Sequence, residues 1–382
     1  MARVSIGMPT YNRRDVIRRA VDSVLAQTCG DWELVIVDDG STDGTRDTLA
    51  GIDPRIRVVV QENQGISGAR NTALQHCRGE LVAFLDSDDA WPPHHLALAT
   101  AFFDAHPGEH FYTSEFWEDF GVGEHVKHFQ VETGDWYPAT ARRIGSRAFS
   151  APPPEGDPYL WYYQARQPAG AWAAPVLAAT PYREVLHYTG SIFPMWRWGW
   201  LLAMQPTVIT QHAAQAVGGF DGRYRIASDF GFLAELCRRF RVNFLSAPGC
   251  IKFEYAEGKR PISEGHLVTG RTAVQFHEEV LGLLEELYWS KAPQDPELAA
   301  LRGFRQYLVG RAALAKGERA VALRYLEQAV QAYPGADVSA ALWLSRLVGS
   351  GALSSALYRA GLTAMALPGR LRHRLARLAG TA

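Results

Sequence analysis

Short, continuous apolar runs alternate with segments of helical periodicity in residues 1–113, and this alternation restricts the possible folds severely. The runs "RVSIGMP", "WELVIVDDGS", "RIRVVVQE" and "ELVAFLD" have the length and composition of strands that are buried on both faces. Between them lie stretches such as "RRDVIRRAVDSVLAQT", whose apolar residues recur at helical spacing. Strands separated by helices predict an α/β fold with a mainly parallel sheet flanked by helices.

The pattern changes twice further along the chain. Residues 114–205 are rich in Pro, Gly, Trp and Tyr and lack a sustained period, which predicts an irregular insertion with some short helices. The strand and helix signals return in 206–265. A length of 382 residues is typical of at least two domains. We therefore predict one domain over 1–265, followed by a small all-helical C-terminal domain over 266–382.

The C-terminal domain contains two features that suggest partners. Residues 307–334 resemble one tetratricopeptide-like hairpin, which could bind a protein, form a homodimer or brace the first domain. Residues 357–380 carry five arginines and no acid, interleaved with leucines, so they either lie on an anionic membrane surface or form a solvated helix.

Net charge and targeting signals bear on nucleic-acid binding and on the cellular location of the protein. The net charge of −1 provides no field that would recruit nucleic acid. The N-terminus lacks the pattern of a signal peptide, and no window is apolar enough to span a membrane. We expect a cytoplasmic protein, either free or peripheral on the cytoplasmic membrane face.

Three carboxylates, Asp86, Asp88 and Asp89, follow the apolar run "LVAFL". Like charges this close repel one another unless a cation, a proton or strong donors offset them. Carboxylates at this spacing can bind Mg²⁺ or Mn²⁺, which prefer oxygen ligands and are commonly shared with substrate phosphates. Turn formation is the alternative for any single aspartate, because Asp bonds its own backbone in loops. Three acids together favour the metal site.

Other polar groups occur at equivalent places in the pattern. Ligands of doubly wound sheets bind at the carboxyl ends of the strands, so four segments should converge there: 9–12, 38–41, 68–71 and 86–89. The motifs GxGxxG, GxxxxGK[ST] and GxSxG are missing at these points, which argues against a dinucleotide fold, a P-loop and a hydrolase triad.

For several individual residues in these segments, the sequence allows either a ligand-binding role or a structural role. Asp39 binds a ribose hydroxyl or a base N–H, or else it caps the next segment, "STDGTRDTLAG", a predicted helix with Ser41 or Thr42 as N-cap. Tyr11 stacks on a base or belongs to the core. Arg70 faces a phosphate or is a solvated helix residue.

The segments "VSIGMPTYNRRDVIRRAVDSVLAQTCGDWELVIVDDGSTDGT", "NQGISGARNTAL" and "GELVAFLDSDD" closely resemble family 2 glycosyltransferases. These are inverting enzymes with the GT-A fold of nucleotide-diphospho-sugar transferases. The resemblance covers residues 3 to about 105 and resumes over 216–236, "AVGGFDGRYRIASDFGFLAEL". It implies a GT-A fold and does not indicate which sugar is transferred.

For the nucleoside pocket, the resemblance implies roles for Pro9, Tyr11 and Asp39, with Tyr11 stacking on the base and Asp39 accepting from it. Arg70 would lie near the base or the diphosphate. These assignments come from the positions that match the family's motifs.

For the reacting groups, the resemblance implies that Asp86 and Asp88 form the DxD motif that contacts the ribose and the metal, or that Asp89 is the ligating acid. Asp229 matches the catalytic base. The family usually has an acid before this aspartate, whereas this chain has Ser228. His266 is a candidate to complete the metal shell, with a loop histidine as the alternative.

The function implied is transfer of a sugar from a nucleotide-diphosphate donor, with UDP-sugar as the first expectation, and with Mn²⁺ or Mg²⁺. The acceptor would be a hydroxyl of a glycan, a lipid-linked sugar or a protein, as in polysaccharide biosynthesis. The alternative is a catalytically silent sugar-nucleotide or glycan-binding module whose helical domain recruits a partner, and Ser228 is its support in the sequence.

Overall fold

The computed structural model describes residues 2–119, 125–127, 153–199, 201–253 and 273–347. The chain divides into two compact units, 1–261 and 262–382, and each is described by itself. The predicted division after residue 265 falls among residues 254–272, outside the described residues, and stays a prediction.

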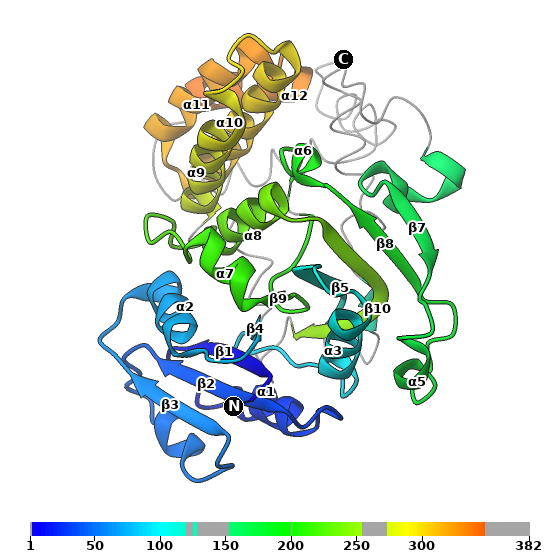
Figure 1. Ribbon diagram of the computed structural model, residues 1–382. Helices are drawn as coiled ribbons and strands as arrows, with labels where there is room; N and C mark the ends of the chain where they lie inside the picture. Colours follow the sequence, from blue (N-terminus) through cyan, green and yellow to red (C-terminus); the bar gives the residue numbers. More distant parts are fainter. Residues whose placement is uncertain (1, 120–124, 128–152, 200, 254–272, 348–382) are drawn as a thin grey trace, which may run out of the picture. The chain divides into compact units, whose positions relative to one another are not determined.

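The first unit is built on one sheet, ten-stranded in the described residues (Figure 1). Its strands are β1 (Val4–Thr10), β2 (Trp32–Asp38), β3 (Ile56–Val60), β4 (Leu81–Phe84), β5 (Phe111–Asp119), β6 (His125–Lys127), β7 (Ala165–Pro168), β8 (Leu186–Gly190), β9 (Val208–Thr210) and β10 (Val242–Phe253). They lie in the order β3-β2-β1-β4-β9-β5-β10-β8-β7, and β6 pairs with β5.

The four strands from β3 to β4 are parallel, which confirms the parallel sheet predicted from the first part of the sequence. The rest of the sheet is mixed: β9 is antiparallel to β4 and β5, while β10 is parallel to β5 and antiparallel to β8. The strand order changes direction beside β1, because β2 lies on one side of it and β4 on the other. Such a switch point is where open α/β sheets bind ligands.

Helices cover both faces of this sheet (Figure 1). They are α1 (Ile17–Leu25), α2 (Gly65–His76), α3 (His95–Ala105), α5 (Ala174–Leu177), α6 (Phe193–Trp196), α7 (Gln211–Val217) and α8 (Ser228–Arg239), with the 3-10 helices η1 (Thr45–Leu49), η2 (Pro154–Gly156) and η3 (Pro158–Trp161). The Thr210 hydroxyl caps α7 by accepting from the Ala213 N–H, and Gly218, at φ 85°, ends it in the left-handed region.

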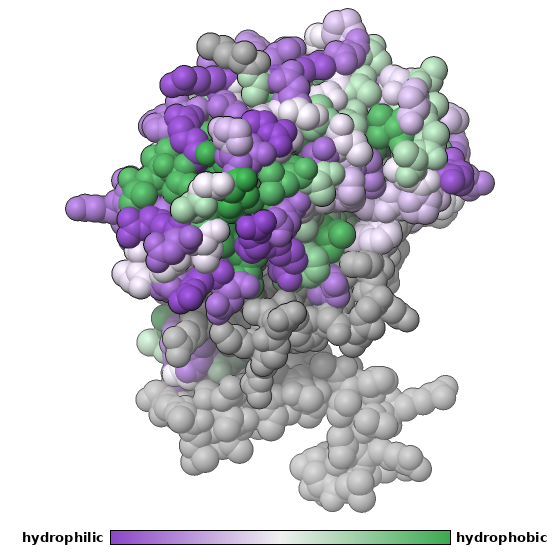
Figure 2. Space-filling model, turned by 90° about the horizontal axis from the view of Figure 1, so that it is seen from below, coloured by the Kyte–Doolittle hydropathy of each residue, from purple (hydrophilic) through white to green (hydrophobic). Residues whose placement is uncertain are grey.

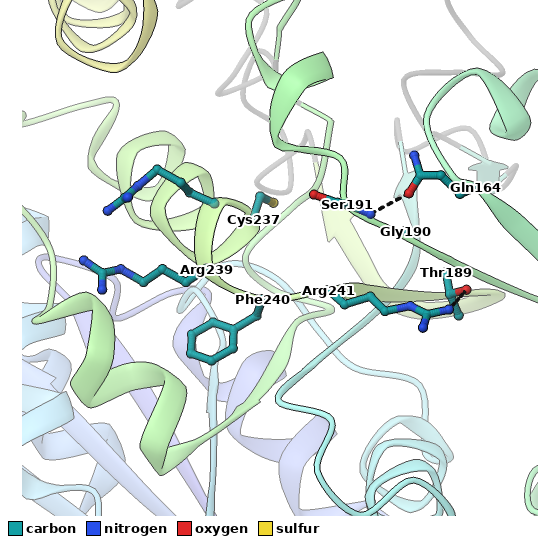
Figure 3. A pocket seen from close by; sticks show the side chains of 9 residues that line it. Gln164, Thr189, Gly190, Ser191, Cys237, Arg239, Phe240 and Arg241 are labelled. Carbon is teal, nitrogen blue, oxygen red and sulfur yellow. Dashed lines mark hydrogen bonds between the residues drawn. The ribbon is translucent and has the colours of Figure 1, made fainter. Parts of the chain in front are cut away.

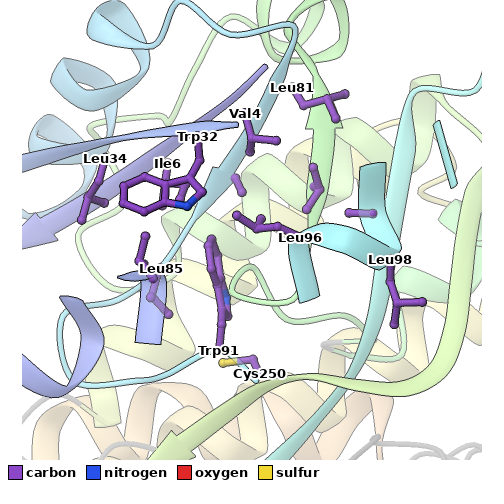
Figure 4. Close-up of a cluster of buried hydrophobic side chains, with 14 of the residues drawn as sticks. Val4, Ile6, Trp32, Leu34, Leu81, Leu85, Trp91, Leu96, Leu98 and Cys250 are labelled. Carbon is purple, nitrogen blue, oxygen red and sulfur yellow. The ribbon is translucent and has the colours of Figure 1, made fainter. Parts of the chain in front are cut away.

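The main core lies between the sheet and helices α1 and α3. Val4, Ile6 and Met8 alternate along β1 toward this side, and Trp91 and Cys250 belong to the same buried cluster (Figure 4). Alternation along a strand places the intervening residues on the opposite face. Helix α2 packs there, on β1 and β2.

Gly7 allows α2 to approach β1 closely. A Cβ atom on Gly7 would lie 2.7 Å from Cε1 of Phe84 and 3.0 Å from Cβ of Ala73. Ala73 lies one turn beyond Arg70 on α2. A small residue in β1 therefore brings the helix that carries Arg70 against the carboxyl end of the sheet.

Two predictions of local structure were wrong. The stretch 41–51 holds only the short η1, which Gly44 enters at φ 87°, without a side-chain cap; the Ser41 hydroxyl instead accepts from the Asn12 N–H at 2.9 Å. The segment 114–205 also contributes most of β5 and all of β6, β7 and β8 to the sheet, so it is not only irregular. Among its described aromatic side chains, Tyr162, Tyr163, Trp196 and Trp198 are at most 2% exposed and belong to the core.

The second unit is helical in its described residues, as predicted. It contains α9 (Ala273–Leu284), the π-helix η5 (Glu285–Trp289), α10 (Pro296–Lys316), α11 (Arg319–Ala332) and α12 (Ala336–Leu347). Helices α10 and α11 form the predicted hairpin, because Gly317 at φ 79° ends α10. The basic stretch 357–380 lies outside the described residues, and its membrane contact stays a prediction.

None of the helices in the described part of the chain is long and apolar enough to cross a membrane. On the side seen from below in Figure 1, a band of apolar residues lies between hydrophilic ones (Figure 2).

The close approach at Gly7 gives a test of stability. We expect Gly7→Ala to lower the free energy of unfolding by about 1–3 kcal/mol, because the added methyl group overpacks the contact with Phe84 and Ala73. Gly30→Ala is the matched control, since a Cβ there meets no atom within 4 Å. Urea unfolding followed by tryptophan fluorescence measures both; equal effects of the two substitutions would refute the packing argument.

Candidate active site

A pocket of about 430 Å³ lies at the carboxyl ends of β1, β2 and β4, the predicted place. It brings together five of the predicted residues: Pro9, Tyr11, Asp39, Asp86 and Asp88. Three more lining residues, Thr10, Ala69 and Ser87, lie in the segments that were expected to converge here, whereas the sequence reasoning did not single out Arg13, Asn63, Gly65 and Ile66. Arg13 could have been found from the sequence, because it is a cation two residues after Tyr11 in "PTYNRR".

The pocket has an apolar edge that could hold a flat ring. Tyr11 is 47% exposed and Ile66 37% exposed, and both line the pocket. Large apolar side chains are usually buried, and an exposed pair at a pocket marks a binding surface. Tyr11 is therefore not core, which removes one of its two readings.

Asp39 is held rigidly at the same pocket. Its Oδ1 accepts from the Gln61 amide at 2.7 Å and from the Gln64 N–H at 2.9 Å, and its Oδ2 accepts from the Gly65 N–H at 2.9 Å. A carboxylate offers about four acceptor sites, so one remains for a ligand N–H or hydroxyl. Its neighbour Asp38 is buried and structural, since it accepts from the Ser41 N–H.

Asp86 has a donor on each carboxylate oxygen. Nη2 of Arg70 lies 2.9 Å from Oδ1, and the Gln205 amide nitrogen lies 2.6 Å from Oδ2. Burial opposes ionisation of Asp86, but the charge and hydrogen bond of Arg70, helped by Gln205, lower its pKa overall. Asp86 is thus an ionised carboxylate with a set orientation.

Asp88 and Asp89 differ from Asp86 in their surroundings. Burial and the charge of Asp86 raise the pKa of Asp88, while Arg13 opposes this with Nη2 at 3.6 Å from Oδ2. Asp89 is 3% exposed, and burial together with the charges of Asp88 and Asp86 raises its pKa well above the usual value. Asp88 lines the pocket, whereas Asp89 does not line it.

Helix α2 connects this pocket with the start of α8. The side-chain amide of Asn71 donates to the Phe220 carbonyl at 2.8 Å and accepts from the Phe220 N–H at 2.7 Å. The Ser67 hydroxyl donates to the Tyr224 carbonyl at 2.8 Å. Gly218 and Gly219, both at positive φ, let the chain turn into this position.

Asp229 lies in the first turn of α8, where the helix dipole favours a negative charge. Burial raises its pKa to about 6, and the charge of Asp86 adds to this while Arg70 opposes it. Asp229 also contributes to the raised pKa of Arg70. Its neighbour Ser228 is 1% exposed, and its hydroxyl has no partner among the described residues.

The carboxylate oxygens at the pocket suit a hard divalent cation only if a bound ligand supplies further oxygen ligands to the same cation. Asp88 and Asp86 offer carboxylate oxygens at the pocket wall. Within the described ranges, no group of three His, Cys, Asp or Glu side chains could hold a metal ion. Mg²⁺ and Mn²⁺ sites commonly use one or two carboxylates plus substrate phosphates, which fits this set. His266 lies outside the described residues.

A second pocket, of about 350 Å³, lies at the other end of α8 (Figure 3). Arg238, Arg239 and Arg241 line it, but the Arg241 side chain runs toward Thr189 while that of Arg239 points away from it. Arg238 and Arg239 pair with Glu235. Two of the three guanidinium groups are paired with Glu235 and the third bonds Thr189, so they do not form a shared anion site in this pocket.

Comparison with known proteins agrees with this geometry. Residues 5–148 match Glycosyl transferase family 2. The chain carries a family 2 glycosyltransferase domain. The structure of S. aureus TarS 1–349 in complex with UDP-GlcNAc has a similar fold, with a TM-score of 0.54. The two chains are 17% identical, and the match covers 90% of this chain and 87% of that one. This supports the GT-A fold.

Curated relatives are similar over about a quarter of this chain. WfgD of Escherichia coli, a UDP-Glc:alpha-D-GlcNAc-diphosphoundecaprenol beta-1,3-glucosyltransferase, is 46% identical over 97 residues, which are 25% of this chain and 38% of WfgD. The succinoglycan biosynthesis protein ExoW of Rhizobium meliloti is 42% identical over 106 residues, 26% of this chain and 33% of ExoW. The chain spans about a third of the length of these relatives.

The pair of Arg70 and Asp86 gives a test of the site. We expect Arg70→Met to lower the free energy of unfolding by about 3 kcal/mol, because it leaves Asp86 without its cation in a mostly buried place. Adding Asp86→Asn should recover part of the loss. Arg18→Met, which breaks an exposed pair with Asp22, is the control and should leave stability unchanged. Chemical unfolding of these three variants and of the unsubstituted chain measures the losses; similar losses for Arg70→Met and Arg18→Met would contradict the assignment.

Proposed function

We propose that this chain is an inverting, metal-dependent glycosyltransferase that moves a sugar from a UDP-sugar to a hydroxyl of a glycan, lipid-linked or protein acceptor. The observation that carries the proposal is the arrangement around Arg70. This one buried cation bonds Asp86 in the donor pocket and shares an electrostatic interaction with Asp229 on α8. The donor acid Asp86 and the candidate base Asp229 therefore both lie within the electrostatic reach of one cation.

Support for a UDP-sugar comes from the pocket and from relatives. Tyr11 offers an exposed ring for stacking on a base, and Asp39 keeps one acceptor site for a base N–H or a hydroxyl. WfgD is named for UDP-Glc, and TarS was solved with UDP-GlcNAc. That the base of the donor is uracil, and which sugar it carries, are parts of the proposal.

Asp88, with Asp86 beside it, would hold Mn²⁺ or Mg²⁺ together with the diphosphate. The cation, when bound, offsets the negative charge that develops on the leaving nucleotide. Asp88 is suited to this because its carboxylate lines the pocket, where burial and the charge of Asp86 raise its pKa and a cation beside it would stabilise the ionised form. Arg13 faces the same carboxylate and would move toward the phosphates once a cation takes its place.

Asp229 would act as the general base. Its carboxylate takes the proton of the acceptor hydroxyl while that oxygen forms a bond to the anomeric carbon and the bond from this carbon to the diphosphate breaks. A single displacement inverts the anomeric carbon. A pKa of about 6 suits this role, because the carboxylate is mostly ionised at neutral pH and still basic enough to accept a proton.

Calorimetric titration tests the donor site. We expect UDP to bind in the presence of Mn²⁺, more tightly than GDP or dTDP. EDTA, or the substitution Asp88→Ala, should weaken binding by a factor of roughly 10 or more. Absence of binding by every nucleotide in the presence of Mn²⁺ would refute the donor site.

The pH dependence of transfer tests the base. We expect kcat/KM to rise about tenfold per pH unit below pH 6 and to level off above it, because the reaction needs the ionised form of a group with a pKa of about 6. Asp229→Asn should lower kcat by roughly 10² to 10⁴ while UDP binding is retained. If UDP binds but no sugar is transferred, and Asp229→Asn changes nothing, the chain is the silent binding module that Ser228 suggests.

A further inference from the structure

We propose that Gln205 is a positioning residue for the donor site: it orients Asp86 from the opposite side to Arg70. This inference rests on the proposed function, since it concerns the same pocket. Gln205 lies in the turn that leads into β9, 119 residues after Asp86 in the sequence. It does not line the pocket and it matches none of the motifs that indicated the site.

The contact is short and directed. Nε2 of Gln205 donates to Oδ2 of Asp86 at 2.6 Å, while Nη2 of Arg70 donates to Oδ1 at 2.9 Å. Donors on both oxygens fix the plane of the carboxylate, which a single donor would leave free to rotate. Hydrogen bonds to a charged acceptor are about twice as strong as neutral ones, so the constraint is substantial.

Gln205 can orient Asp86 because its own backbone is fixed. The indole N–H of Trp91 donates to the Gln205 carbonyl at 2.8 Å, and Trp91 is only 2% exposed. The turn that contains Gln205 is closed by Thr207, whose N–H donates to the Met204 carbonyl at 3.0 Å. The acidic loop 86–91 is therefore bonded to this segment at both ends, through Asp86 and through Trp91.

An amide suits this position better than a cation. It supplies an N–H to Asp86 without adding a second positive charge beside Arg70, so the negative potential that attracts a divalent cation to Asp88 is kept. With one donor on each oxygen, Asp86 keeps acceptor sites in a fixed plane beside Asp88. Gln205 thus fixes the orientation in which Asp86 can share a cation with Asp88.

The test compares nucleotide binding in variants of the full chain. Gln205→Met keeps the side-chain volume and removes the donor, and we expect it to weaken UDP binding in the presence of Mn²⁺ by a factor of roughly 10. Gln205→Glu keeps the shape and places a second carboxylate beside Asp86, so it should weaken binding more. In transfer assays the donor KM should rise more than kcat falls.

Gln164→Met is the matched control. Gln164 accepts from the Ser191 N–H at 2.6 Å and donates to the Tyr162 carbonyl at 3.2 Å, at the other pocket. Its substitution should change thermal stability but leave UDP binding as in the unsubstituted chain. A purely structural role for Gln205 would give the same result as this control.

A double-substitution cycle with Asp86→Asn separates action through Asp86 from general packing. If Gln205 acts through Asp86, adding Gln205→Met to Asp86→Asn should change the UDP dissociation constant by less than about twofold. A full tenfold effect in that background, or no effect of Gln205→Met and Gln205→Glu alone, overturns the inference while the donor site stands. Failure of the unsubstituted chain to bind UDP overturns both.

Discussion

The ion pair between Arg70 and Asp86 organises the site, because it is the point at which three parts of the first unit meet. Arg70 is carried by α2, Asp86 follows β4, and the interaction of Arg70 with Asp229 reaches the start of α8. Arg70 is 2% exposed, so its charge is poorly screened by water and acts strongly on both carboxylates. The same cation lowers the pKa of Asp86 and limits the rise of the pKa of Asp229.

Three neighbouring aspartates are tolerated at the end of a buried strand because each is compensated differently. Asp86 is ionised and bonded by Arg70 and Gln205. Asp89 is buried, and burial with the charges of Asp88 and Asp86 raises its pKa well above the usual value, which favours its neutral form. Asp88 faces Arg13 at 3.6 Å, a longer contact than those of Asp86. Asp86 and Asp88 both line the pocket, and Asp88 is the one of the two with the weaker contact.

Close packing fixes the position of the turn before α8 relative to the acidic loop that follows β4. Gly7 lets α2 approach β1, and α2 then holds the turn before α8 through Asn71 and Ser67. Phe220 in that turn stacks on Phe232 at 4.2 Å and packs edge-on against Phe84 at 5.2 Å. A shift of α2 would therefore displace both the donor acids and the candidate base, and close packing makes such shifts costly.

The sequence by itself determined the parallel half of the sheet, most of its helices and five of the residues that line the pocket, because strand and helix periods and the polar residues after each strand are local patterns. It mispredicted 41–51, where the Asn12 N–H donates to the Ser41 hydroxyl, and it missed β6, β7 and β8, whose short strands carry no clear period. Only the tertiary structure decided which groups face each of the three acids and brought in Gln205. Charge compensation and hydrogen bonding between residues far apart in the chain depend on distances that no local pattern contains.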